Sequence, residues 1–186
     1  MGYKLTGGLK SFIIIIEIKL KIIARVHFMK TIIILFGIIA LSYASFTSDM
    51  LALHNNVRTG LGISKLTWSS SLAKTATAWA VQMAKTGNFE HSHESGKGEN
   101  IAYGTKSVYT YTKLFNAWLA EKQYFIKGAK FPYCSTTGSY KAVGHYTQII
   151  WAKTTKVGCG MASTSKNNYL VCQYTKPGNY LNQYVY

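Results

Sequence analysis

The chain has 186 residues, of which 14% are aromatic and only 15% charged, a composition that excludes a disordered polymer and suits one globular domain with a short appendage. The 21 basic residues outnumber six acidic ones, so the formal charge is +15 and anionic partners must be considered. The basic residues are scattered among Tyr, Ser and Thr and form no nucleic-acid-binding motif, so nucleic acid is not an expected partner.

The first 45 residues have the pattern of a secretory leader. Met29 and Lys30 precede an apolar segment of about ten residues at 31–40, and small residues follow up to Ala44, after which cleavage is expected. An earlier apolar run at 12–23 is interrupted by one acidic and two basic residues. Charges in that position disfavour a membrane span.

We therefore predict a leader at residues 1–45, with a signal peptide at 29–44, and a secreted domain at 46–186. Translation would start at Met29, or at Met1 with a long removable leader. The alternative is a signal anchor that keeps the protein on the membrane. Because six basic residues and one acid precede residue 45, the remainder keeps a formal charge of +10.

Two helices are predicted in the first half of the secreted domain. Residues 48–49 can cap a helix that ends near Gly60, and on it His54 is expected to be structural, tying the helix to a neighbour through its ring nitrogens. Residues 69–71 can cap a second helix that stops at Gly87. The apolar face of this second helix repeats at helical spacing: Leu72, Ala76, Trp79, Ala80 and Met83.

A polar, glycine-rich stretch at 88–104 predicts a loop that leads into an element at Ile101, and a third helix is predicted at about 108–123. The buried stripe of this helix consists of Tyr111, Leu114, Phe115, Trp118 and Leu119. Glu121 follows Leu114 by seven residues and Trp118 by three, so its carboxylate falls on the same inward stripe. A carboxylate aimed at a core requires a partner, because an unpaired buried charge is costly.

The last third begins with an aromatic loop at 128–140. The run 144–151 (GHYTQIIW) follows, and it places His145 at the edge of a core that contains the apolar residues after it. Two short strands at 157–163 and 169–174, joined by turn-forming residues, predict a hairpin.

Three cysteines lie in this secreted domain, and secretion permits disulfides. Cys159 and Cys172 lie in the two strands of the predicted hairpin and are expected to pair. Cys134 is then the odd thiol.

Four motifs in this order resemble those of the CAP superfamily, which groups cysteine-rich secretory proteins, antigen 5 and plant pathogenesis-related proteins. The first signature is similar to residues 144–151 together with 157–160, and the second to residues 171–180. Two shorter motifs match at 54–58 (HNNVR) and 98–101 (GENI). Val143 stands where plant members often have a cysteine, so the plant set of three disulfides is absent.

The resemblance implies an α/β fold: a three-layer α-β-α sandwich with a central, mostly antiparallel sheet and an open cleft. It also implies that two histidines and two glutamates meet in the cleft. By position these are His91, Glu99, Glu121 and His145, and His93 is an alternative to His91. Glu121 is the inward carboxylate that helical spacing identifies independently.

Two imidazoles and two carboxylates can hold zinc or another divalent metal. His91 and His145 would be the ligands, and the acids would orient the rings. We expect occasional metal and no obligate cofactor, because two histidines alone make a weak, pH-sensitive site. The alternative is a hydrogen-bonded cluster that serves structure only.

The favoured function is that of a secreted binding protein, not an enzyme, for a hydrophobic small molecule such as a sterol or fatty acid. The resemblance places the ligand loop at 124–140, with four aromatic residues: Phe125, Phe131, Tyr133 and Tyr140. One alternative is a metal-assisted hydrolase with Glu99 or Glu121 as the base. Another is an extracellular effector that contacts a protein or an anionic membrane.

Overall fold

The computed structural model describes residues 7–186, apart from the side chains of residues 7–18, 40–42 and 44. Met1, one of the two candidate start sites, lies outside the described residues. The chain divides into two compact units, Met1–Phe46 and Thr47–Tyr186.

The first unit consists of the apolar part of helix α1 (Gly7–Gly60). Within it, Lys19–Ile39 is 21 residues long with a mean hydropathy of 2.0, which is long and apolar enough to cross a bilayer. A signal sequence near the N-terminus has the same properties. The helix is therefore compatible with a signal peptide, and by length and composition it also suits the anchor alternative.

The helix start predicted at residues 48–49 is wrong, because α1 continues through this position. Nothing in the preceding sequence breaks the helix, which contains no proline. Asp49 does not cap a helix but accepts a hydrogen bond from the Tyr111 hydroxyl at 2.7 Å. The predicted end at Gly60 is confirmed.

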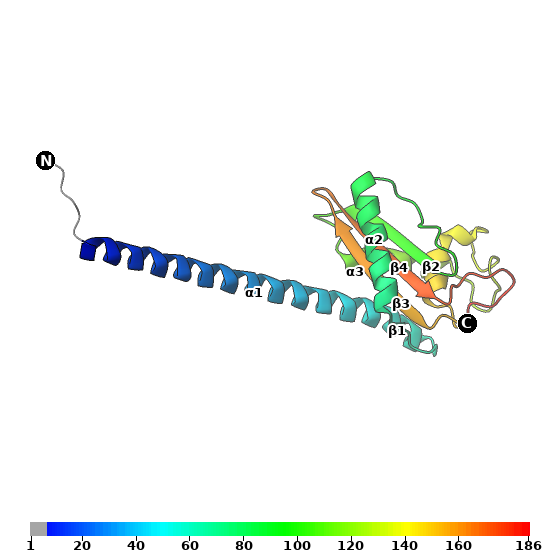
Figure 1. Ribbon diagram of the computed structural model, residues 1–186. Helices are drawn as coiled ribbons and strands as arrows, with labels where there is room; N and C mark the ends of the chain where they lie inside the picture. Colours follow the sequence, from blue (N-terminus) through cyan, green and yellow to red (C-terminus); the bar gives the residue numbers. More distant parts are fainter. Residues whose placement is uncertain (1–6) are drawn as a thin grey trace. The chain divides into compact units, whose positions relative to one another are not determined.

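The second unit combines helices with one four-stranded sheet (Figure 1). After α1 its elements are β1 (Thr67–Trp68), α2 (Ser70–Thr86), β2 (Gly98–Thr105), α3 (Tyr111–Ala120), the 3-10 helices η1 (Glu121–Tyr124) and η2 (Tyr140–Ala142), α4 (Gly144–Ile149), β3 (Lys156–Ser163) and β4 (Asn167–Thr175). The strand order is β1-β3-β4-β2, and only the β1–β3 pair is parallel. The α/β class and the mostly antiparallel sheet are as predicted, and β2 is an edge strand.

The sequence signals for α2 are confirmed. Ser69 caps the helix by accepting a hydrogen bond from the Leu72 amide. Gly87 ends it in the left-handed conformation at φ 77°, with its amide donating to the Met83 carbonyl. These are the usual start and stop signals of a helix.

Strand β3 alternates glycine and cysteine because its two faces have different neighbours. A side chain at Gly158 or Gly160 would collide with the backbone of α2, so these glycines let the helix approach the sheet closely. Between them, Cys159 points to the opposite face and forms the predicted disulfide with Cys172, its direct partner in the β3–β4 register. α2 lies across β3 and β4 in Figure 1.

The second face of the sheet is covered by the end of α1 and by α3 and α4, which completes the three layers. On β4, Tyr169 and Val171 pack in a cluster with α2, whereas Tyr174 contacts His54 of α1. His54 is fully buried, its Nδ1 donating to the Met50 carbonyl at 2.7 Å and its Nε2 lying 2.9 Å from the Tyr174 hydroxyl. Its predicted structural role agrees with these contacts.

Helix α3 is shorter than the predicted 108–123. Thr110 caps it, and the α-helix ends at Ala120, where the tighter helix η1 begins. Leu114 and Trp118 are buried as expected. Glu121 therefore belongs to the first turn of η1, yet its side chain still points inward.

Arg58 is a fully buried cation at the end of α1, and all its hydrogen bonds go to backbone carbonyls. Its Nε donates to Ser64, Nη1 to Ile149 and Trp151, and Nη2 to Thr154, at 2.8 to 3.1 Å. Burial lowers the pKa of Arg58 to about 10, so the guanidinium is still charged at neutral pH. Arg58 thereby connects the end of α1 to the last residue of α4 and to the segment that follows α4.

Replacing Arg58 with Met is expected to destabilise the protein by about 3 kcal/mol or more, because the three buried carbonyls of Ile149, Trp151 and Thr154 lose their donor. Arg58→Lys should recover only part of this, since one ammonium cannot reproduce the planar fork. Urea unfolding of the secreted protein would measure both. Lys65→Met, at an exposed position, is the control, and equal stability of the Arg58→Met and control variants would contradict the prediction.

His54 should make stability depend on pH. Burial lowers the pKa of His54 from 6.5 to about 4, although the hydrogen bond to Met50 opposes this shift. The unfolded chain therefore binds more protons between these values, so stability falls as pH drops from about 6.5 to about 4, by up to about 3 kcal/mol.

In His54→Gln, the stability difference between pH 7 and pH 5 should shrink relative to the unsubstituted protein. His93→Asn, at an exposed position, should leave that difference unchanged. Urea unfolding at the two pH values is the measurement, and an unaltered pH dependence in His54→Gln would refute this role.

Candidate functional site

Glu121 and His145 form the first of two acid–imidazole pairs. Glu121 Oε1 lies 2.6 Å from His145 Nδ1, while Oε2 accepts from the backbone amides of His145 and Tyr146 at 2.9 and 3.0 Å. One carboxylate thus orients the ring and also binds the first free amides of α4, where negative charge is favoured. Trp118 stacks on the imidazole, with ring centroids 5.9 Å apart.

His91 and Glu99 form the second pair, with Nδ1 and Oε1 3.0 Å apart. Glu99 lies on strand β2. Its carboxylate also accepts hydrogen bonds from the Ser92 amide, the Ser92 hydroxyl and the Gln173 side-chain amide, at 2.6 to 2.9 Å. Burial alone would raise the pKa of Glu99, but the hydrogen bonds from His91, Gln173 and Ser92 lower it to about 2. Glu99 is therefore ionised throughout the neutral range.

The two pairs reach the same cleft from opposite faces of the edge strand β2. Glu99 contacts Gln173, which accepts from Thr75 of α2, whereas the next residue, Asn100, contacts α4. The cleft has a volume of about 630 Å³. Its lining consists of His91, Glu99, Asn100, Phe131, Pro132, Tyr140, Lys141, Gly144, His145, Asn179 and Leu181.

Three of the four predicted cleft residues line this cavity, and Glu121 lies behind the ring of His145. The alternative residue His93 is not part of the lining. It borders a smaller cavity of about 190 Å³ beside His91. The binding role of the four residues stays a prediction.

The aromatic loop contributes only part of its predicted residues to the cleft. Phe131 and Tyr140 line it and contact each other, with ring centroids 5.2 Å apart. Phe125 packs instead against Tyr146, and Tyr133 is 76% exposed to solvent. The sequence places four aromatic residues in one loop, but in the fold two line the cleft, Phe125 is partly buried outside it and Tyr133 is exposed.

Asn100 is a cleft residue that the sequence did not identify. Its side-chain amide donates to the His145 carbonyl at 3.0 Å and to the Tyr174 hydroxyl at 3.3 Å. The same hydroxyl lies next to His54, so a chain of buried hydrogen bonds joins α1 to the backbone of His145. The sequence signal for Asn100 was its place in the GEN motif, in which only Glu99 was predicted to have a role in the cleft.

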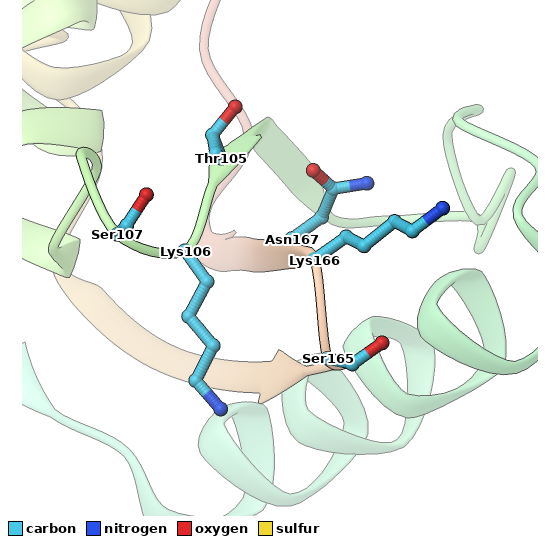
Figure 2. A pocket seen from close by; sticks show the side chains of 6 residues that line it. All are labelled: Thr105, Lys106, Ser107, Ser165, Lys166 and Asn167. Carbon is cyan, nitrogen blue, oxygen red and sulfur yellow. The ribbon is translucent and has the colours of Figure 1, made fainter.

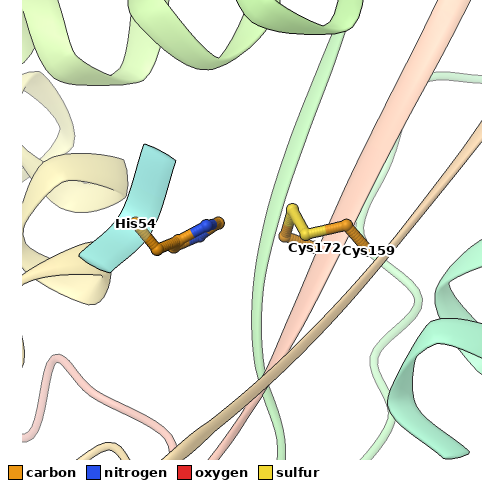
Figure 3. Close-up of side chains that lie close together, drawn as sticks. All are labelled: His54, Cys159 and Cys172. Carbon is orange, nitrogen blue, oxygen red and sulfur yellow. A yellow bond between two sulfur atoms is a disulfide. The ribbon is translucent and has the colours of Figure 1, made fainter. Parts of the chain in front are cut away.

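The cysteines do not add ligands to the cleft. The ring nitrogen of His54 and the sulfurs of Cys159 and Cys172 lie within 4.8 Å of one another. Figure 3 shows these three side chains. Because the two sulfurs are bonded to each other, neither is a thiolate that could bind a metal. Cys134 is a buried free thiol, as predicted for the odd cysteine.

A second cavity of about 530 Å³ lies at the other end of β2 and β4. Its lining residues are Thr105, Lys106, Ser107, Ser165, Lys166 and Asn167. The two lysine side chains extend in different directions in Figure 2 and do not converge on one point. This surface therefore lacks the convergent groups of the cleft.

The cleft lining offers two kinds of contact surface. Each histidine engages a carboxylate through Nδ1, which leaves Nε2 as the ring nitrogen for a metal or a polar group. Phe131, Pro132 and Leu181 supply apolar surface in the same cavity. A molecule with a polar head and an apolar body matches this combination.

Comparisons with known proteins agree with the geometry. Residues 51–174 match the family described as CAP, the cysteine-rich secretory protein family. Pathogenesis-related protein 1A of Nicotiana tabacum is 32% identical over 189 residues, covering the full length of both chains. Venom allergen 5 of Polistes dominula is 34% identical over 132 residues, covering 67% of this chain and 56% of the allergen.

Among solved structures, a crystal structure of NaASP2 with Zn²⁺ superimposes with a TM-score of 0.64 at 27% identity, covering 75% of this chain and 84% of the other. This chain and NaASP2 therefore share the α-β-α architecture. The chain belongs to the CAP family of cysteine-rich secretory proteins.

Proposed function

We propose that this protein is secreted and binds a hydrophobic small molecule, such as a sterol or fatty acid, in the cleft on β2. The observation that carries the proposal is the composition of that cavity, in which apolar residues stand with oriented imidazoles and a buried carboxylate. Its volume of about 630 Å³ lies within the range typical of small-molecule sites.

The lining suggests how such a ligand would lie. Its apolar body would rest against Phe131 and Leu181, and Tyr140 would offer a flat face. A hydroxyl group could bond His145 Nε2, and a carboxylate could pair with Lys141. The polar end of the ligand would thus contact polar side chains, and its apolar body would be shielded from water.

We also propose that His91 and His145 hold a divalent metal such as zinc through Nε2. The donor set fits the ion, because each ring is neutral when it binds metal and each is oriented by a carboxylate, as in carboxylate–histidine–metal arrangements. A bound ion would supply a positive centre for the polar end of a ligand. Two ligands leave positions open for water or for that ligand.

The hydrolase alternative has less support. A general base works best with a pKa near the operating pH, and the pKa of Glu99 is lowered to about 2. Glu121 already accepts two backbone amides and the ring of His145. Neither carboxylate is thus placed to take a proton from water readily.

Secretion is supported by the helix in the first unit and by the kind of relatives found. A signal peptide at 29–44, cleaved after Ala44, would release a chain that starts at Ser45 and contains the domain at 46–186. Pathogenesis-related and venom proteins act outside the cells that make them, which favours an extracellular effector role here. The segment Lys19–Ile39 would serve as an anchor if cleavage does not occur.

Sterol and fatty-acid binding should be saturable and should depend on the cleft. Tyr140→Ala is expected to weaken binding at least fivefold, because it removes an aromatic wall of the cavity. Tyr103→Ala, an exposed tyrosine elsewhere on β2, should change it less than twofold. Binding of a fluorescent sterol or fatty acid to the secreted protein gives the measurement. Saturable binding that is the same in both variants would place the ligand elsewhere.

Zinc should bind through the two histidines and weaken as pH falls, since ligating imidazoles must be neutral. His145→Gln and His91→Gln should each abolish most of the heat of zinc binding in titration calorimetry at pH 7.5. Glu121→Gln should weaken it roughly tenfold by freeing the ring. His93→Asn serves as the control, and zinc affinity retained by both ligand variants would exclude the site.

A further inference from the structure

Exposed aromatic, aliphatic and basic side chains surround the mouth of the cleft. We call this surface the cleft rim and define it by Lys130, Tyr133, Tyr140, Lys141, Leu181 and Tyr184. Three members are exceptionally exposed for apolar groups: Tyr133 at 76%, Leu181 at 68% and Tyr184 at 59%. Large apolar groups left in water around a cavity mark a contact surface.

The rim is continuous because two distant segments lie side by side. Lys130 pairs with Tyr184 in an antiparallel bridge, and its Nζ lies 5.1 Å from the centre of the Tyr184 ring. The Phe131 amide donates to the Gln183 carbonyl at 2.9 Å, and the Asn182 amide to the Phe131 carbonyl at 2.7 Å. Tyr140, Lys141 and Leu181 line the cleft itself, so the rim and the cavity form one surface.

Residues 122–186, which supply every member of the cleft rim, carry charge of a single sign. Residues 122–186 contain eight lysines and no aspartate or glutamate. The acids in and behind the cleft have side chains that are only 8% exposed at Glu99 and 17% exposed at Glu121. Lys130 and Lys141 are exposed while these two carboxylates are mostly shielded from solvent, so a partner at the rim meets positive charge.

We propose that the cleft rim docks on the surface of an anionic phospholipid bilayer. Lysines 130 and 141 would bind headgroup phosphates, while the rim tyrosines and Leu181 would enter the interfacial layer, where amphipathic rings are favoured. This inference rests on the proposed function, because an apolar ligand is sparingly soluble in water and is best collected from a membrane. The cleft mouth would then face the source of its ligand.

Charge alone would also suit an acidic polysaccharide. Leu181 argues for the bilayer, since an aliphatic side chain 68% exposed gains by leaving water for acyl chains and has no comparable partner on a sugar chain. The experiment therefore includes both kinds of anion.

The test compares two triple variants of the full chain, each recovered in the same form with its N-terminus determined by mass spectrometry. The rim variant carries the rim substitutions Lys130→Gln and Tyr184→Ser together with Lys153→Gln. Lys153 is an exposed lysine next to the rim, where it donates to Gln183, and none of the three residues lines the cavity. The control carries Lys106→Gln, Lys166→Gln and Tyr103→Ser, which remove the same groups at the far end of β2 and β4. Both lose two charges and one exposed tyrosine.

Flotation with vesicles of phosphatidylcholine and 30% phosphatidylserine is expected to show roughly tenfold weaker binding for the rim variant and a change under twofold for the control. Equal losses in the two variants would reduce the effect to net charge and overturn the proposal. Binding to polygalacturonate that depends on the rim, without binding to vesicles, would overturn it in favour of a polysaccharide.

A separate arm keeps this inference apart from the proposed function. Sterol delivered to each variant as a cyclodextrin complex tests the cleft without any membrane, and the rim variant should bind it like the unsubstituted protein. If no variant takes up sterol while vesicle binding still depends on the rim, the docking surface stands and the cleft proposal fails.

Discussion

The short helix α4 is held at both ends by buried charges of opposite sign, and the cleft depends on this arrangement. At its start, Glu121 accepts the amides of His145 and Tyr146. At its end, Arg58 donates to the carbonyls of Ile149 and Trp151. Each charge has the sign that the helix dipole favours at that end. A helix of six residues has little stability of its own, so these contacts fix the position of His145.

The sheet positions the second half of the site through its open edge. Strand β2 has a partner on one side only, and its neighbouring residues Glu99 and Asn100 point to opposite faces. Glu99 therefore orients His91 on the α2 side of the strand, and Asn100 supports the backbone of His145 on the α4 side. An interior strand could not do this, because helices would cover both faces and a further strand its edge. The cleft is a consequence of an edge that no strand pairs.

The oriented polar side chains and the apolar surface of the cleft come from different parts of the fold. The oriented imidazoles come from segments anchored to helices and sheet, whereas the apolar lining comes from the loop around Phe131 and from the segment that contains Leu181. Loops can vary without disturbing the scaffold, so under the proposed function the loop residues would select the ligand. The positive, tyrosine-rich rim belongs to the same loops.

Local signals in the sequence determined much of the scaffold. Ser69 and Gly87 mark the ends of α2, because helix capping depends on residues near in the chain. Spacing also indicated that Glu121 points inward. The sequence could not show that α1 passes through residues 48–49, since a candidate cap is overridden when the preceding residues also form helix. Only the tertiary structure decided that residues 144–149 form a helix, that Asn100 supports His145, and that two of four loop aromatics reach the cleft, because each of these results from contacts between segments far apart in the chain.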